Sequence, residues 1–361
     1  MTRDPRGNFF EDFAAGQVFH HPVPRTLSDG DAAVYIALTG DRSPLYSSSE
    51  FALSLGLRDR PLHDLLVFHI VIAKSVTDIS LNAIANLGYA ELRFLAPVYA
   101  GDTLRAESTV IGLRQVSSGD AGIVWVRTTG SNQRGLPVLS FVRWVMVSKR
   151  NAAAPESDAP PPALARTVNP ADLSVPAGLH LTAFPSWATG SDRLLEDYAV
   201  GERIDHVDGV TLEEAEHAMA TRLYQNNARI HFDARLAADT RFGKRLVYGG
   251  HVISLARALS CNGLENALSC LAWDSGMHSN PVFHGDTIYA WSEVLEVLDL
   301  PGHRDFGALR LRLAATKNQT PAELNFAAKH RDEATGRERY PANVVLDLEH
   351  VLLMPRRGAA S

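Results

Sequence analysis

The chain has 361 residues, of which 45% are hydrophobic and 21% charged, with a formal net charge of −6. This composition is typical of a globular protein long enough for two domains, and it excludes an extended disordered chain. The negative charge argues against a nucleic-acid-binding protein, which needs a basic face. We expect no secretory signal and no membrane span, because no run of about 18 apolar residues is visible.

The first half shows a helix signal, a buried helix and then strands. Residues 28–31 read Ser-Asp-Gly-Asp and lead into an apolar stretch that predicts a helix to residue 38. Residues 65–73 are almost wholly apolar, as in a buried helix. A tight turn is predicted at 101–103, and residues 122–129 and 138–147 predict strands because β-branched and aromatic residues are frequent there.

A proline- and alanine-rich stretch separates this half from the rest. Residues 151–176 contain Pro155, the run 160–162 and Pro170, with little hydrophobic periodicity, which is typical of an extended surface linker. We therefore divide the chain into a unit over 1–150, a linker over 151–182 and a unit over 183–361. The only cysteines, Cys261 and Cys270, indicate a reduced, cytoplasmic protein.

The second half repeats the plan of the first. Residues 11–16 return at 196–201, an offset of 185 positions (11 to 196), and residues 97–103 return at 281–287. Thr211 with Glu214 three residues later predicts a capping box, and residues 251–259 predict a second buried helix. A buried helix followed by antiparallel strands, twice over, predicts an α+β fold built by internal duplication.

Each copy carries a version of one motif at the same relative place. Residues 41–46 read Asp-Arg-Ser-Pro-Leu-Tyr, and residues 226–231 read Asn-Asn-Ala-Arg-Ile-His. Both resemble the motif Asp-x-Asn-Pro-(Leu/Ile/Val)-His of the MaoC-like (R)-specific enoyl-CoA hydratases. The resemblance implies a tandem (double) hotdog fold, each unit an antiparallel sheet wrapped around a long buried helix. The first copy keeps the acid, Asp41, but not the histidine; the second keeps His231 but has Asn226 for the acid.

A second family element distinguishes the copies. The family has a His-Gly pair at the start of the buried helix, and the glycine N–H faces the thioester oxygen. The matching residues are His63-Asp64 in the first copy and Tyr248-Gly249, followed by Gly250, in the second. Glycine permits close approach of backbone to ligand, and an N–H at a helix N-terminus favours negative charge, which an aspartate would repel. We therefore expect the second copy to be the active half, with Gly249 and Gly250 at the thioester.

Longer stretches in both halves resemble the mesaconyl-CoA (2-methylfumaryl-CoA) hydratases within this family. They are residues 7–13, 64–71, 78–89, 141–147, 225–232 and 248–254. The resemblance implies a lyase that reversibly hydrates mesaconyl-CoA to β-methylmalyl-CoA, with the CoA thioester as substrate and without metal or other cofactor. That substrate has a free carboxylate, so we expect a cation near the pocket. Arg229 is the candidate and Arg93 the second choice, since a guanidinium matches a carboxylate with two hydrogen bonds.

Roles in the reaction can be proposed for two residues of the second copy, but the proton donor is left open. His231 is the candidate for activating water, because its ordinary pKa is near neutrality, and Asn226 holds water or imidazole without acting as an acid. Three candidates for the proton donor stay open: His231 itself, a bound water, and Asp41 brought across the interface of the two copies. Asp41 also fits a simple helix N-cap.

Several other interpretations of the chain stay open. It could be another (R)-specific enoyl-CoA hydratase or 3-hydroxyacyl-CoA dehydratase, a hotdog thioesterase, or a non-catalytic acyl-thioester-binding protein, since neither copy has an intact pair. The two copies predict an internal pseudo-dimer, with a homodimer of whole chains as a further option. His69 and His251 are predicted to be hydrogen-bonded core residues.

Overall fold

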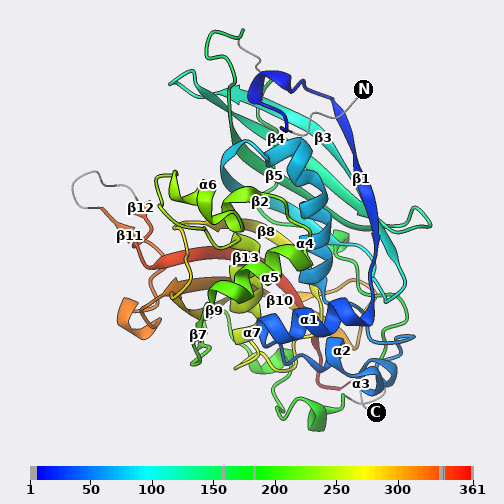
Figure 1. The fold of residues 1–361 in the computed structure, drawn as a ribbon. Coiled ribbons are helices and arrows are strands. Elements are labelled where there is room, and N and C mark those ends of the chain that lie inside the picture. The colour runs from blue at the N-terminus through cyan, green and yellow to red at the C-terminus, as the bar shows by residue number, and fades with distance from the viewer. Residues whose placement is uncertain (1–5, 156–158, 182–183, 333–335, 337, 359–361) are drawn as a thin grey trace.

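The computed structural model describes residues 6–155, 159–181, 184–332, 336 and 338–358, and an 11-stranded antiparallel sheet forms its centre (Figure 1). The strand order is β1-β3-β4-β5-β2-β8-β13-β10-β9-β6, and β7 pairs with β9. The strands of the first half are β1 (Val18–Thr26), β2 (Ala83–Phe94), β3 (Thr103–Gln115), β4 (Ala121–Ser131) and β5 (Pro137–Ser148). Those of the second half are β6 (Arg203–Asp205), β7 (Val210–Thr211), β8 (Cys270–His278), β9 (Thr287–Asp299), β10 (Phe306–Lys317) and β13 (Val344–Pro355). A separate hairpin pairs β11 (His330–Arg331) with β12 (Glu338–Arg339).

The two halves join at one seam in the sheet. Strands β2 and β8 pair antiparallel there, with Tyr89 opposite Gly276 and Leu92 opposite Trp273. Counted outward from the seam, the first half runs β2-β5-β4-β3-β1 and the second runs β8-β13-β10-β9, with β6 and β7 outermost. The same order on both sides is the structural counterpart of the sequence repeat.

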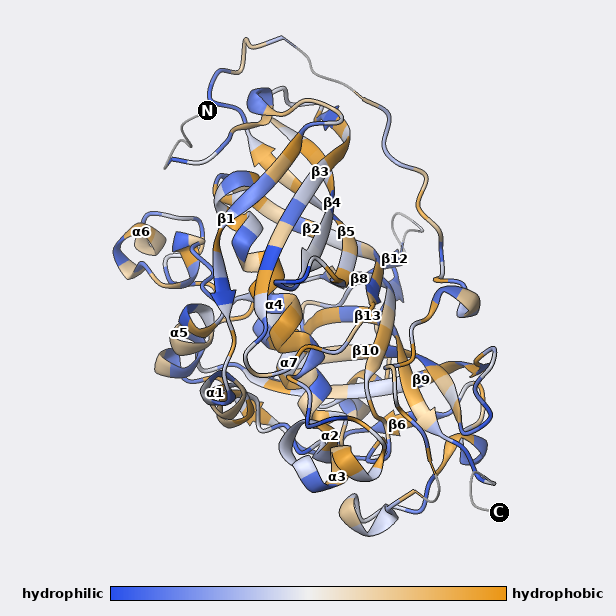
Figure 2. Cartoon of the chain, turned by 90° about the vertical axis from the view of Figure 1, so that its right-hand side faces the viewer, coloured by the Kyte–Doolittle hydropathy of each residue, from blue (hydrophilic) through white to orange (hydrophobic). Residues whose placement is uncertain are grey.

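Helices lie in a layer on one side of the sheet (Figures 1 and 2). Next to the strands are the buried helices α4 (Asp64–Ser75) and α7 (Gly249–Leu259), which match the two predicted apolar stretches. Outside them are α1 (Asp29–Thr39) and α5 (Glu214–Leu223). The short elements are α2 (Pro44–Ser47), α3 (Ser49–Ser54), η6 (Arg229–His231) and α6 (Ala234–Ala238). A short π-helix, η2 (Val76–Ser80), continues α4.

The halves share one hydrophobic core. The largest cluster of buried residues contains Phe68 and Tyr89 from the first half together with Trp273 and Leu348 from the second. The rings of Phe68 on α4 and Trp273 on β8 lie 4.6 Å apart between centroids, so this contact joins the two halves. Because each half contributes to this cluster, the two copies stabilise one another, and neither packs as an independent unit would.

The two outer helices begin differently from one another. Ser28 caps α1 as predicted, since its Oγ accepts from the Asp31 N–H and the Asp31 carboxylate accepts from the Ser28 N–H. The predicted capping box of Thr211 is wrong: α5 begins at Glu214 with Glu213 as its N-cap. Thr211 ends β7 instead, where its hydroxyl lies 2.8 Å from that of Thr287. The Thr211 hydroxyl therefore pairs with the Thr287 side chain on the neighbouring strand and does not cap the helix.

The segment after residue 150 is attached to the sheet. Ala159 forms a β-bridge with Leu113, and the Val168 N–H donates to Asp274 over 2.6 Å.

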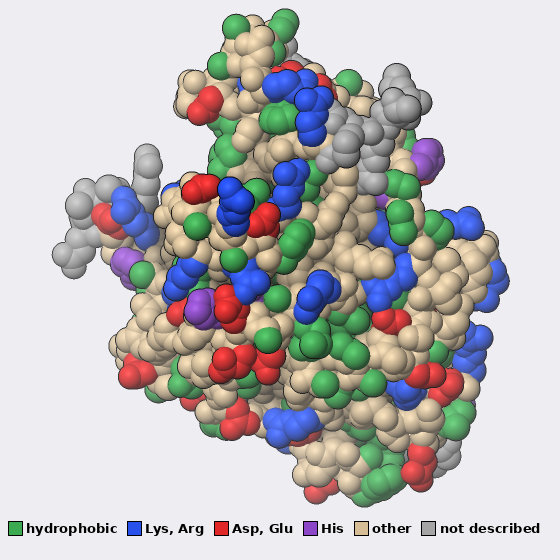
Figure 3. Space-filling model, viewed as in Figure 1, with side chains coloured by type: hydrophobic (Ala, Val, Ile, Leu, Met, Phe, Trp, Pro, Cys, Tyr) green, Lys and Arg blue, Asp and Glu red, His purple; other side chains and the backbone are tan. Residues whose placement is uncertain are grey.

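The boundaries proposed at 150 and 182 stay a prediction, as does the cytoplasmic location. No helix among the described residues is long and apolar enough to span a membrane. On the face shown in Figure 3, acidic and basic side chains are interspersed.

Candidate active site

The two motif segments lie beside the N-termini of the two buried helices. In the first half, Asp41, Tyr46, His63 and Asp64 gather with Arg257 from α7; we call these residues the first cluster. In the second half, Asn226, His231, Tyr248, Gly249 and His278 form the second cluster. The duplication thus places one polar cluster at the start of each helix.

Asp41 and His63 pair inside the first cluster. Their Oδ2 and Nε2 atoms are 3.3 Å apart, and both side chains are almost fully buried. Burial alone would raise the pKa of Asp41, but His63 and Arg257 outweigh it and lower this pKa to about 2. The Leu65 N–H donates to Nδ1 of His63 over 3.0 Å, so the ring proton must be on Nε2, facing Asp41. His63 therefore has no nitrogen lone pair left to accept a proton from water.

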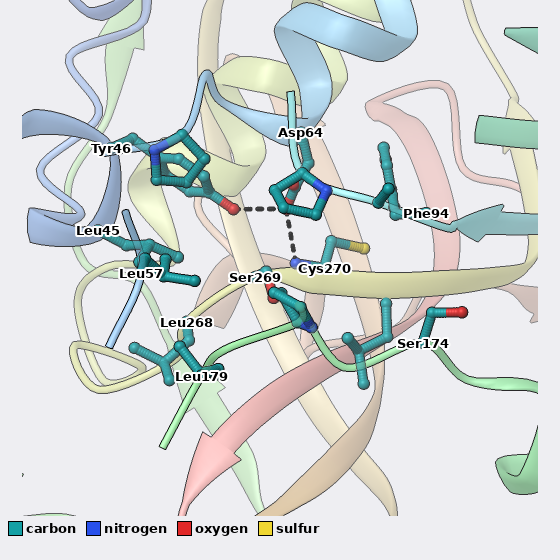
Figure 4. A pocket seen from close by; sticks show the side chains of 15 residues that line it. Leu45, Tyr46, Leu57, Asp64, Phe94, Ser174, Leu179, Leu268, Ser269 and Cys270 are labelled. Carbon is teal, nitrogen blue, oxygen red and sulfur yellow. Dashed lines mark hydrogen bonds between the residues drawn. The ribbon is translucent and has the colours of Figure 1, made fainter. Parts of the chain in front are cut away.

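Asp64 stands where the family has a glycine. Its carboxylate accepts hydrogen bonds from the Tyr46 hydroxyl and, over 2.7 Å, from the Cys270 N–H (Figure 4). Burial raises the pKa of Asp64. The hollow beside it has a volume of about 30 Å³ and is mainly apolar, with Leu45, Leu57, Phe94 and Leu179 among its lining residues. An acceptor group at this position cannot stabilise an enolate oxygen.

The His231 ring carries its proton on the nitrogen opposite to that of His63. Its Nδ1 lies 2.9 Å from the Leu246 carbonyl, which can only accept, so the ring proton is on Nδ1. Nε2 has no hydrogen bond within the described part of the chain and carries the lone pair. Burial lowers the pKa of His231 to about 4, against the raising effect of the Leu246 carbonyl. At neutral pH the imidazole is therefore uncharged and able to accept a proton.

Asn226 shapes the turn that carries His231. It is 6% exposed, and its Oδ1 accepts from the Ala228 N–H over 3.0 Å. Such an Asx turn fixes the backbone two residues on, immediately before η6 and His231. Among the described residues no hydrogen bond joins the Asn226 and His231 side chains. The geometry therefore favours a positioning role for Asn226.

Gly249 and Gly250 are the first two residues of α7. Their N–H groups have no partner within the helix, as at every helix N-terminus. A Cβ atom on Gly249 would stand 2.7 Å from the His278 ring, and one on Gly250 would stand 2.4 Å from the Tyr248 ring. Both positions thus need glycine for steric reasons, and both present backbone to the second cluster.

His278 belongs to the second cluster, although the sequence analysis did not name it. It ends β8 and lies against Gly249, and its Nε2 is buried without a hydrogen-bond partner in the described chain. Burial, and then the nearby His231, lower its pKa to about 4. The signal was present in the repeat: at the offset of 184 that relates 97 to 281, His278 corresponds to Phe94. The second copy thus has a polar residue, His278, where the first has an apolar one, and this difference points to the second cluster.

Asp41 is not brought to His231. No hydrogen bond or ion pair joins them in the described chain, and aromatic rings lie between the clusters. Tyr35 contacts His63 at 4.9 Å between centroids, and Tyr224 contacts both Tyr35, at 6.4 Å, and Tyr248, at 5.9 Å. Asp41 as the proton donor across the interface therefore gains no support from the structure.

The remaining predicted residues have different surroundings. Arg229 begins η6 with an exposed side chain, and Arg93 is half-buried on β2 at the seam. His69 is hydrogen-bonded in the core as predicted, 2.8 Å from the Ser254 hydroxyl. His251 is buried as predicted, but its Nδ1 lacks a partner and its side chain forms no hydrogen bond among the described residues, so the predicted hydrogen bonding is not observed.

Comparisons with known proteins agree with this architecture. The family model described as mesaconyl-CoA hydratase matches residues 1–326. The chain is 54% identical over 352 residues to a β-methylmalyl-CoA dehydratase of Chloroflexus aurantiacus, covering 98% of each chain. It is 53% identical to a mesaconyl-CoA hydratase of Cereibacter sphaeroides, covering 97% of this chain and 98% of the relative.

Solved structures show the same fold. A crystal structure described as a MaoC-domain protein dehydratase from Chloroflexus aurantiacus superposes with a TM-score of 0.93 at 52% identity, covering 99% of this chain and 100% of the other. A Mycobacterium tuberculosis protein described as having a double hotdog fold superposes with a TM-score of 0.74 at 28% identity, covering 97% and 99%. The α+β double-hotdog prediction is confirmed.

Proposed function

The chain belongs to the mesaconyl-CoA hydratase family, and we propose that it performs the hydration with the second cluster alone. The enzyme is a hydro-lyase: it adds water reversibly across the double bond of mesaconyl-CoA to form β-methylmalyl-CoA. The observation that carries the site assignment is the free Nε2 of a neutral, buried His231.

The first step is activation of water by His231. Its Nε2 removes a proton as the water oxygen bonds to the β-carbon of the thioester. The electron pair of the double bond moves toward the carbonyl, so negative charge develops on the thioester oxygen. A neutral imidazole in a buried site is suited to this task because its lone pair is available at neutral pH.

The developing charge is stabilised at the start of α7. The N–H of Gly249, and the helix N-terminus as a whole, favour negative charge at the thioester oxygen. His278 supplies a second polar group against the same glycine. The first cluster has the Asp64 carboxylate at the matching place, which would repel that oxygen.

The second step returns the proton. As the enolate collapses, the α-carbon takes the proton from Nε2 of His231, which regenerates the neutral imidazole. The sum is the addition of one water molecule, and the reverse steps eliminate it. Water and thioester supply every atom and there is no net redox change, so the proposal requires no cofactor.

Purified protein with mesaconyl-CoA tests the proposal. Loss of the enoyl-thioester absorbance should accompany formation of β-methylmalyl-CoA, seen by mass spectrometry, without free CoA detected by a thiol reagent. Release of CoA without the hydroxy product would indicate a thioesterase, and binding without turnover of any enoyl-CoA would indicate a binding protein. Light scattering of the same sample tests whether whole chains pair beyond the internal pseudo-dimer.

A further inference from the structure

Arg143 is a buried guanidinium without a carboxylate partner. The residue lies on β5 and is 2% exposed. Its Nη2 donates to the Ser75 hydroxyl over 2.7 Å and its Nη1 to the Ser80 hydroxyl over 3.3 Å. Nε has no hydrogen-bond partner, and no ion pair joins Arg143 to an acidic residue among those described. Burying an unpaired cation is costly, so such an arrangement points to an anion that it receives.

The other buried arginines in the described chain have acidic neighbours. Arg257 is close to Asp41 and Asp64 in the first cluster. Arg310 forms ion pairs with Asp274 and with Glu296, the latter at 2.8 Å. Their charges are compensated within the protein, whereas that of Arg143 is not.

Arg143 lies next to the second cluster, although it comes from the first half. It is opposite Tyr89 in the pairing of β2 with β5, and it interacts electrostatically with Tyr89 and Tyr248. The Tyr248 ring contacts that of His231 at 5.6 Å between centroids, and the Tyr89 ring contacts that of His278 at 5.9 Å. Arg143 therefore shares a tyrosine neighbour with each of the two imidazoles, Tyr248 with His231 and Tyr89 with His278.

We infer that Arg143 binds the free carboxylate of the substrate and so selects a dicarboxylic monothioester over a simple enoyl-CoA. The inference rests on the proposed function of the second cluster. In mesaconyl-CoA the carboxylate is attached to the carbon that receives water, at the opposite end of the double bond from the thioester. Its receptor must therefore lie near the carbon that His231 hydrates, and Arg143 interacts with Tyr248, whose ring contacts that of His231.

The guanidinium suits a carboxylate for two further reasons. Its planar fork can donate two parallel hydrogen bonds to the two oxygens of one carboxylate, and the serine hydroxyls hold the group in one orientation. Burial lowers the pKa of Arg143 only to about 10, so the side chain keeps its charge at neutral pH. Arg229, the candidate proposed from the sequence, has an exposed side chain and so lacks the buried surroundings of Arg143.

The test compares two substrates that differ only at the carboxylate. Mesaconyl-CoA and 2-methylcrotonyl-CoA, which has a methyl group in its place, are assayed with the wild type and with Arg143→Gln. We expect kcat/KM for mesaconyl-CoA to fall on the order of 100-fold, while that for 2-methylcrotonyl-CoA stays unchanged or rises. Arg257→Gln and Arg229→Gln are the matched comparisons and should leave the ratio of the two substrates as in the wild type.

A binding measurement separates recognition from folding and from turnover. Calorimetry with the saturated thioesters succinyl-CoA and butyryl-CoA should show that the wild type prefers succinyl-CoA and that Arg143→Gln loses this preference. If Arg143→Gln does not fold, Arg143→Lys is used and should show a smaller preference than the wild type.

Three results overturn the inference. One is an equal loss on both substrates by folded Arg143→Gln, and another is selective loss in Arg229→Gln instead. The third is a wild type without preference for succinyl-CoA. A wild type that binds succinyl-CoA selectively through Arg143 but hydrates no enoyl-CoA contradicts the proposed function instead and leaves the carboxylate site standing.

Discussion

His63 and His231 are held in opposite tautomers by the backbone. The Leu65 N–H donates to Nδ1 of His63, whereas Nδ1 of His231 donates to the Leu246 carbonyl. The first histidine is left with an Nε2–H that faces Asp41, and the second with an Nε2 lone pair. Two buried imidazoles in a duplicated fold thus have different chemistry because different backbone groups contact them.

The pH dependence of hydration should report the low pKa of His231. Because burial lowers this pKa to about 4, the imidazole stays neutral down to about pH 5. We expect kcat/KM to be flat from pH 8 to about pH 5 and then to fall with an apparent pKa of about 4. Circular dichroism at each pH confirms that the enzyme is folded. A decline centred near pH 6.5 would contradict the assignment.

Gly249→Ala should impair catalysis. The added methyl group would stand 2.7 Å from the His278 ring, so either the ring or the start of α7 must move. Losing one aligned donor to an oxyanion costs about 100-fold in kcat, and we expect a loss of that order in steady-state assays. Gly30→Ala is the matched control, because its new Cβ would meet only the Ser28 hydroxyl at 3.4 Å. Equal activities of the two variants would remove Gly249 from the site.

Asn226 should be replaceable by aspartate but not by alanine. Aspartate keeps the oxygen that accepts from the Ala228 N–H, and alanine removes it. Loosening this turn moves His231, and misplacement by about 1 Å can cost 100-fold in rate. We expect kcat to fall strongly in Asn226→Ala and to be largely retained in Asn226→Asp. If both variants lose activity equally, the amide itself takes part in the reaction.

Stability should decrease as the pH falls below 6.5. Burial lowers the pKa values of five histidines to about 4, namely His206, His217, His231, His251 and His278. Between pH 6.5 and 4 the unfolded chain binds protons at these rings and the folded protein does not. Each ring can therefore remove up to about 1.4 kcal/mol of unfolding free energy per pH unit in that window.

Urea denaturation at pH 7.5 and pH 5 measures this effect. The variant His251→Asn should show a smaller decrease than the wild type, because one buried titrating ring is removed. An unfolding free energy that is equal at the two pH values would show that these rings are not buried in neutral form.

Much of the fold could be predicted from the repeat. The apolar stretches 65–73 and 251–259 became α4 and α7, because a helix that is apolar all round must be covered on all sides. The shared core was not predicted, since each half by itself is long enough to form a domain. That core depends on the β2–β8 seam, and such long-range pairing leaves no local signal in the sequence.

The candidate site could be proposed from the sequence only within the two elements that resemble the family. Asn226, His231 and Gly249 come in this order within 24 residues (226–249), in segments that resemble the family's motifs. His278 and Arg143 come from separate strands. His278 reaches the second cluster through the register of β8, and Arg143, the proposed carboxylate receptor, lies on β5 of the other half, opposite Tyr89. Arg229, proposed as the substrate's carboxylate receptor from its place two residues before His231, has an exposed side chain, and its role stays a prediction.

The central claim is that the second half performs the reaction and the first half does not. Its most direct test is the hydration of mesaconyl-CoA by His231→Asn and His63→Asn, each confirmed to be folded. Asparagine can keep the backbone hydrogen bond in both variants and lacks the imidazole base. We predict that His231→Asn loses at least about 100-fold in kcat, as expected for a general base, and that His63→Asn retains most of its activity. An active His231→Asn together with an inactive His63→Asn would place the reaction in the first half and contradict the account.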